Sequence, residues 1–174
     1  MGFHHLAIAT RDPEANHAFY TDAMGFTLDR TVVAPTDTGG WARHLFYDTG
    51  NGEMIAFWDL HDDTIGDFEP SISTGLGLPQ WTNHIAFDAP TLEDLAAARQ
   101  RWQDKGHYVY EIDHGWCTSI YTTDPNGIMV EFCTTTAQAT DTDRADALRL
   151  LHEAAPALEE APTGTLYSPT TASV

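Results

Sequence analysis

The sequence predicts an α+β protein in which two β-α-β-β-β modules follow one another and a helical tail ends the chain. One short pattern occurs twice, as His4-His5-Leu6-Ala7-Ile8 and as Asn83-His84-Ile85-Ala86-Phe87. The elements after each copy have the same predicted order, and the copies are offset by 79 residues, from His5 to His84. Because side chains alternate between the faces of a strand, each histidine is expected to face away from its apolar neighbours.

The first module is predicted to run over residues 1–60. Residues 3–9 have the pattern of a strand, and Asp12 followed by Pro13 is typical of a helix N-cap and first position. Gly25 is expected to end that helix after about Met24. The strands that complete the module are predicted at 27–34, 41–47 and 54–60.

Residues 61–80 are rich in Asp, Gly, Ser, Thr and Pro, so they are predicted to connect the modules. The second module, residues 81–135, repeats the order of the first. Its predicted elements are a strand at 82–88, a helix at 92–105 ended by Gly106, and strands at 107–112, 117–122 and 128–133. Residues 136–174 are predicted to form a C-terminal helix near 141–154 and a tail that is flexible or draped over the surface.

Composition excludes several classes of protein. The net charge is −18 with a single lysine, which argues against nucleic-acid binding because no basic surface could neutralise phosphates. No apolar run has the length of a membrane span, and the N-terminus lacks the regions of a signal peptide. A soluble, cytoplasmic protein without membrane partners is therefore expected. Cys117 and Cys133 match no zinc motif and are interpreted as reduced thiols.

The repeated histidine and the turn Asp124-Pro125-Asn126-Gly127 before Glu131 resemble the vicinal oxygen chelate superfamily over residues 2–135. This superfamily includes glyoxalases, extradiol dioxygenases, fosfomycin-resistance transferases and methylmalonyl-CoA epimerases. The resemblance implies that the modules curl into a cup of mixed sheet that holds a divalent metal. It also implies that His5, His84 and Glu131 are the metal ligands.

The fourth ligand position of the superfamily falls at Ala56, which cannot bind metal. Two histidines and one carboxylate resemble the extradiol dioxygenases, in which Fe(II) keeps positions open for substrate oxygens and O2. The resemblance thus implies an Fe(II) dioxygenase that acts on a catechol or a related small aromatic with neighbouring oxygens. The alternatives, with Mn, Ni or Zn as the metal, are a glyoxalase-like lyase or isomerase and a thiol transferase of the fosfomycin-resistance type. A non-enzymatic binding protein is the remaining alternative.

Two further residues are predicted to be catalytic. If the turn at 124–127 closes a hairpin, residues whose numbers add up to about 250 face one another, which places Tyr121 on the face of Glu131 and opposite Met129. In extradiol enzymes a tyrosine ten residues before the ligand glutamate occupies a comparable place. His114 is a candidate acid or base. The modules can pair within one chain or between the chains of a swapped homodimer.

Overall fold

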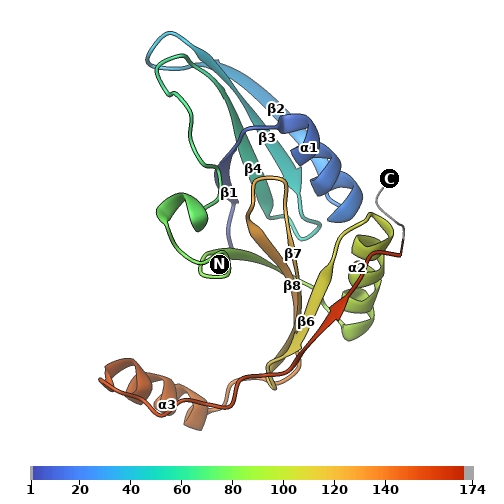
Figure 1. The fold of residues 1–174 in the computed structure, drawn as a ribbon, viewed down its shortest axis with the longest axis vertical. Helices are drawn as coiled ribbons and strands as arrows, with labels where there is room; N and C mark the ends of the chain where they lie inside the picture. Colours follow the sequence, from blue (N-terminus) through green and yellow to red (C-terminus); the bar gives the residue numbers. More distant parts are fainter. Residues whose placement is uncertain (1, 171–174) are drawn as a thin grey trace.

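A computed structural model describes residues 2–170 and confirms the two modules as β1-α1-β2-β3-β4 and β5-α2-β6-β7-β8 (Figure 1). Each module forms its own sheet, and the strand orders β1-β4-β3-β2 and β5-β8-β7-β6-β9 are equivalent up to the last strand. In both sheets the first strand of the module is an edge strand and runs parallel to the last. The first sheet consists of β1 (His5–Thr10), β2 (Thr27–Pro35), β3 (Trp41–Asp48) and β4 (Met54–His61). The second consists of β5 (His84–Asp88), β6 (Val109–Asp113), β7 (Cys117–Thr123), β8 (Met129–Thr135) and β9 (Gly164–Tyr167).

The helices begin and end where local chemistry predicts. The Asp12 carboxylate accepts a hydrogen bond from the Ala15 amide at the start of α1, and the Thr91 hydroxyl caps α2. Gly25 and Gly106 follow the two helical segments with φ angles of 80° and 87°, a conformation that favours glycine. The helical segments are α1 (Pro13–Ala18), the π-helical η1 (Phe19–Ala23), the 3-10 turn η2 (Thr74–Leu76) and α2 (Leu92–Asp104).

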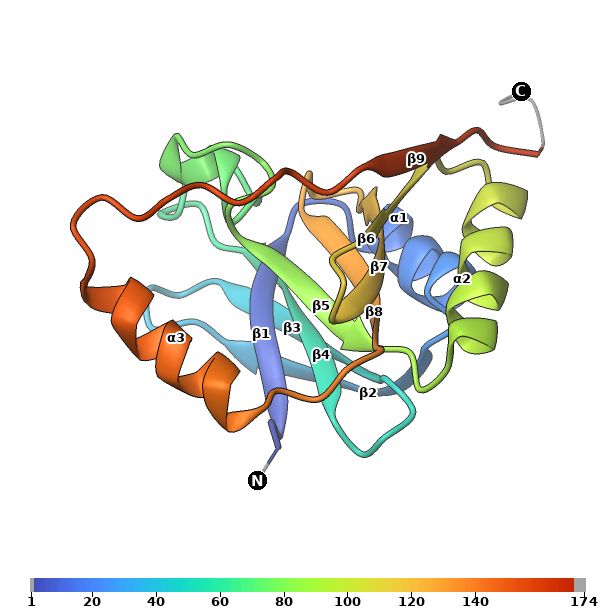
Figure 2. The same ribbon diagram turned by 90° about the horizontal axis from the view of Figure 1, so that it is seen from below.

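One hydrophobic core joins the two modules on their helical side. Tyr20 and Phe26 from the first module pack in the same cluster as Trp102 and Phe132 from the second. Both views show α1 and α2 side by side (Figures 1 and 2). The Arg101 guanidinium also donates hydrogen bonds to carbonyl oxygens at the end of the first helical segment. The opposite face of each sheet, which carries His5 or His84, is therefore left without a helix of its own module.

A buried group of hydrogen bonds fixes the Asp124–Gly127 turn of the second module against the first. The Tyr20 hydroxyl donates to the Asp124 carboxylate at 3.1 Å, and the Thr10 hydroxyl donates to the Asn126 side-chain oxygen at 2.7 Å. The Asn126 amide nitrogen in turn donates to Asn16 at 2.8 Å. Burial raises the pKa of Asp124 and of Tyr20. The turn thus sets the orientation of the modules.

Replacing Asp124 by alanine is expected to lower the free energy of unfolding by about 3 kcal/mol, because buried donors would lose their acceptor. Since burial raises the pKa of Asp124 above 3.8, the folded state holds the proton more tightly than the unfolded state. The contribution of this group to stability therefore decreases as pH rises through the raised pKa. Urea unfolding should show a larger loss near pH 4 than near pH 7. An Asp63→Ala control, on an exposed loop, should change little, and a loss of equal size in both variants would contradict the role of the turn.

The C-terminal region forms an arm and an additional strand. Helix α3 (Asp141–His152) begins at a capping box between Thr140 and Asp143, and none of its residues is buried. It stands away from both sheets in Figure 1. Of the two alternatives predicted for the tail, the flexible one is wrong for Gly164–Tyr167, since β9 pairs with β6; residues 171–174 lie outside the described residues. Among the described helices, none is long and apolar enough to cross a membrane.

Candidate metal centre

The open face of the second sheet gathers three predicted site residues on neighbouring strands. Ala86 of β5 and Tyr121 of β7 both pair with Glu131 of β8. Because alternate residues of a strand share a face, His84 lies on the same side as Ala86 and beside Glu131. The ring of His84 lies 6.2 Å from that of Tyr121, measured between centroids. Adjacent strands therefore bring a histidine, a carboxylate and a phenol together.

His84 and Glu131 are arranged as two donors to one cation. His84 Nδ1 lies 3.1 Å from the Trp81 carbonyl oxygen, which orients the ring and leaves Nε2 directed at Glu131. Nε2 lies 3.1 Å from Glu131 Oε2, and the Glu131 side chain is only 6 % exposed. Two donors bound to one metal at about 2.1 Å and at right angles lie about 3.0 Å apart. The spacing thus fits two donors to one metal ion.

Tyr121 lies closer to Glu131 than the predicted hairpin register implies. The numbers of the residues that pair between β7 and β8 add up to 252 rather than 250. Tyr121 therefore faces Glu131, and the predicted pairing of Tyr121 with Met129 is wrong. The five-residue turn, in which the Asp124 amide bonds to the Ile128 carbonyl, accounts for the shift. The Tyr121 hydroxyl lies 3.1 Å from His114 Nε2. Burial, together with the Glu131 carboxylate, raises the pKa of Tyr121 to about 12, so its phenol remains a donor at neutral pH.

A cavity of about 380 Å³ opens beside Tyr121 on the same sheet. Aromatic and apolar side chains make up much of its wall, among them Tyr108, Tyr110, Met129 and Leu166. Small-molecule sites combine such walls with a few polar groups that fix orientation. The cavity therefore suits a small aromatic molecule with a polar edge near Tyr121.

Two cysteines lie on this face but form no disulfide. Cys117 is buried and Cys133 is partly buried, and both are free thiols, as predicted. Burial raises the pKa of Cys133 to about 11. A thiol that holds its proton is a poor nucleophile, so Cys133 is not a candidate nucleophile at neutral pH.

The open face of the first sheet carries His5, and Ala56 occupies the place on this sheet that Glu131 occupies on the second. Ala7 pairs with Ala56 in the first sheet as Ala86 pairs with Glu131 in the second. His5 is exposed, and its Nδ1 lies 2.8 Å from Nδ1 of His4. The first module therefore contributes an accessible histidine and no carboxylate at this position.

His44, which also faces this side, comes after His114 as a candidate acid or base and is not among the predicted ligands. It pairs with Trp58 of β4 and stacks on that ring at 3.7 Å between centroids. Its ring lies 6.0 Å from that of His5. Burial lowers the pKa of His44, and His5 lowers it further. The alternation that places His44 on the face of Phe46 is visible in the sequence, but the proximity of His44 to His5 depends on tertiary structure.

A single chain does not bring the three predicted ligands together. Within residues 2–170, no three His, Cys, Asp or Glu side chains are grouped so that they could hold a metal ion. His84 meets Glu131 on the second sheet, whereas His5 lies on the first. The common core lies on the helical side, so the two open faces do not pack on one another within the chain.

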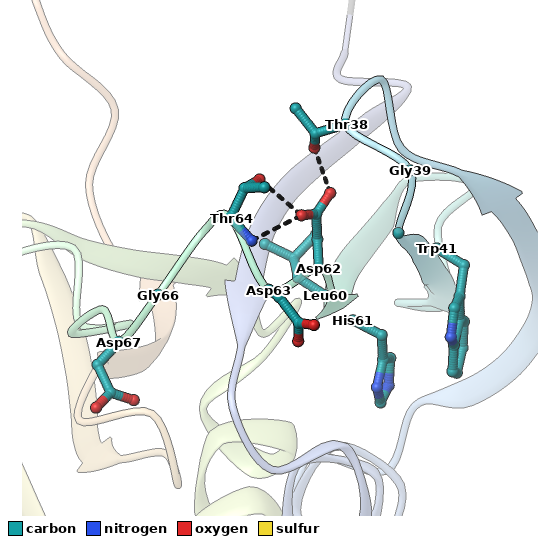
Figure 3. A pocket seen from close by; sticks show the side chains of 11 residues that line it. Thr38, Gly39, Trp41, Leu60, His61, Asp62, Asp63, Thr64, Gly66 and Asp67 are labelled. Carbon is teal, nitrogen blue, oxygen red and sulfur yellow. Dashed lines mark hydrogen bonds between the residues drawn. The ribbon is translucent and has the colours of Figure 1, made fainter.

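A hollow of about 870 Å³ lies elsewhere, at the hairpin end of the first sheet (Figure 3). Its centre is Asp62, whose carboxylate accepts hydrogen bonds from the Thr36, Thr38 and Thr64 hydroxyls. These bonds lower the pKa of Asp62. The carboxylate thus joins the β2–β3 hairpin to the loop after β4, which is a structural role.

Comparison with known proteins agrees with this architecture. Residues 2–132 match the model of the Glyoxalase/Bleomycin resistance protein/Dioxygenase superfamily. No curated protein matches the chain.

A glyoxylase/bleomycin resistance protein/dioxygenase domain from Frankia sp. EAN1pec is similar in structure, with a TM-score of 0.58, 18 % identity, and 78 % of this chain and 98 % of that chain covered. The antibiotic binding protein TnmS3 from Streptomyces sp. CB03234 has a TM-score of 0.54 and 17 % identity, with 78 % and 97 % covered. A putative dioxygenase from Bacillus subtilis has a TM-score of 0.59 and 19 % identity, with 82 % of this chain and 46 % of that chain covered. The chain belongs to the Glyoxalase/Bleomycin resistance protein/Dioxygenase superfamily, that is, to the vicinal oxygen chelate proteins.

Proposed function

We propose that this protein is a metal-dependent enzyme whose metal centre forms between two copies of the chain. His84 and Glu131 of one copy and His5 of the other would be the ligands. The spacing of 3.1 Å between His84 Nε2 and Glu131 Oε2 carries the proposal, because it matches two adjacent positions on one metal. The separation of His5 from this pair within one chain supports a site shared between copies.

The proposed reaction is extradiol-type cleavage of a catechol or a related small aromatic. Bound Fe(II) would supply a Lewis acid with positions open to substrate oxygens and O2. Tyr121, on the strand beside Glu131, would hydrogen-bond an oxygen of the bound substrate, and His114, 3.1 Å from the phenol, would accept or return a proton. The cavity beside Tyr121 offers aromatic walls against which the substrate ring would pack.

Anaerobic metal analysis followed by O2 uptake with a panel of catechols tests this function. Iron together with catechol-dependent uptake would support the dioxygenase. Nickel, zinc or manganese without uptake would replace it by a lyase, isomerase or transferase. Protein that binds no metal under any condition would leave only a binding role.

Mixing two inactive variants tests the shared centre. A His5→Ala chain keeps His84 and Glu131, whereas a Glu131→Ala chain keeps His5. If the centre forms between copies, random reassociation makes half of the dimers mixed, and each mixed dimer contains one intact site, so activity should return to about a quarter of wild type. Mixing His84→Ala with Glu131→Ala is the matched control, since both changes affect the same half of the site. Equal recovery in both mixtures would contradict the shared centre.

A further inference from the structure

Two histidines of the first sheet stack on tryptophans across the same pair of strands, but only one has a partner for its Nε2. His61 stacks on Trp41 at 3.9 Å, and its Nε2 lies 2.9 Å from the Asp59 carboxylate. His44 stacks on Trp58 at 3.7 Å, yet its Nε2 is buried without a hydrogen-bond partner. His44 is only 8 % exposed. A buried polar atom without a partner is costly, so this nitrogen is a candidate for binding something that the chain itself does not supply.

The position of His44 near His5 indicates that the missing partner of its Nε2 is a metal ion. His44 on β3 and His5 on β1 lie on either side of β4, which contributes Ala56 to the same face. Ala56 has no side chain beyond its methyl group, so the two imidazoles approach each other to 6.0 Å between centroids. An imidazole centroid lies about 3.2 Å from a metal on its ring nitrogen, so two ligands of one metal lie at most about 6.4 Å apart. The observed separation is within that limit.

We propose that His44 is a fourth protein ligand of the metal, in the place that Ala56 cannot fill. The inference rests on the proposed metal centre and adds one donor from the same copy that provides His5. The complete centre then has His5 and His44 from one copy and His84 and Glu131 from the other. Four protein donors leave two positions of a six-coordinate ion, so a substrate bound through one oxygen and O2 would fill the centre, whereas a substrate bound through both neighbouring oxygens would leave no position for O2.

Cobalt titration of the metal-free, full-length protein tests the assignment. His44→Phe keeps an aromatic ring against Trp58 and removes only the donor. Loss of an outer-sphere partner weakens metal binding roughly 10- to 100-fold. We expect His44→Phe to weaken Co(II) binding by more than this, and we expect the same of His5→Phe. His61→Phe is the matched control and should bind Co(II) as wild type does. Absorbance of bound Co(II) gives both the affinity and the coordination number.

Thermal unfolding provides a second readout that does not depend on activity. Without metal, His44→Phe should unfold at a temperature equal to or above that of wild type, because it removes a buried nitrogen that has no partner. Added Co(II) should then raise the midpoint of wild type much more than that of the variant. His44→Gln, which keeps a polar side chain, is the second variant if His44→Phe does not fold, and the same loss of affinity is expected.

The Co(II) affinities of the variants distinguish a wrong fourth ligand from a wrong metal centre. Wild-type affinity in the His44 variants, together with loss of Co(II) in His5→Phe and Glu131→Gln, would overturn the fourth ligand alone and leave three donors. Wild-type affinity in all of these variants would overturn both the metal centre and the fourth ligand. A loss in His44→Phe of only 10- to 100-fold, with an unchanged Co(II) spectrum, would make His44 an outer-sphere residue and likewise overturn its assignment as a ligand.

Discussion

Glu131→Gln is expected to abolish tight metal binding and to reduce turnover by more than a hundredfold. Glu131 is the only carboxylate of the proposed ligand set, and its Oε2 lies 3.1 Å from His84 Nε2. Glutamine keeps the size of the side chain but removes the negative charge that a divalent cation needs. His84→Ala and His5→Ala are expected to lose metal similarly, because each removes one donor. Metal content per chain, measured after anaerobic purification, is the readout.

The matched control for Glu131→Gln is Glu111→Gln on β6 of the same sheet. Glu111 pairs with Arg99, and its removal should leave the metal content unchanged. Circular dichroism should show that all the variants are folded, since His5 is exposed and His84 lies at the start of an edge strand. Full metal occupancy in the three ligand variants would rule out the proposed centre.

Tyr121→Phe is expected to keep the metal and the fold but to lower turnover by about ten- to a thousandfold, the range for loss of a hydrogen bond or of help in proton transfer. The phenol lies beside Glu131 and is held by His114 at 3.1 Å. Its pKa of about 12 keeps it protonated over the working pH range. Steady-state kinetics with the substrate found in the catechol panel, on protein of equal metal content, gives the measurement.

Tyr110→Phe is the matched control for Tyr121→Phe, since Tyr110 faces Tyr121 across β6 and β7 and lines the same cavity. It should change turnover by less than Tyr121→Phe, because it is not the tyrosine that pairs with Glu131. His114→Gln should reproduce part of the Tyr121 effect through the lost contact. Unchanged turnover in Tyr121→Phe would assign the phenol to packing.

Much of the fold follows from local signals in the chain. The Asp12 cap, the Gly25 and Gly106 stops and the repeated strand pattern predicted the elements of both modules to within a few residues. Strand β9 could not be predicted, because its pairing with β6 is formed by residues distant in the sequence. The π-helical turn at Phe19–Ala23 depends on packing in the common core in the same way.

The site residues on equivalent strands of the two modules could be predicted from the sequence. Contacts that depend on tertiary structure could not. His84 and Glu131 meet because β5 and β8 are neighbours, which the repeat implies. Residue type could not distinguish the tryptophans, because all are equally apolar. Trp102 is wholly buried, whereas Trp81 and Trp116 are 65 % and 60 % exposed. The unpartnered Nε2 of His44 likewise depends on how side chains from three strands pack.

The common core on the helical side has a consequence for how the proposed centre behaves at different protein concentrations. Because each chain buries Tyr20 and Trp102 in its own interior, separation of two copies would leave the core of each chain intact. Separation would, however, divide the metal ligands between the copies. Metal affinity and association of the chains are then linked by mass action, so dilution should release metal, and added metal should drive association. The apparent metal affinity of this protein would accordingly rise with its own concentration.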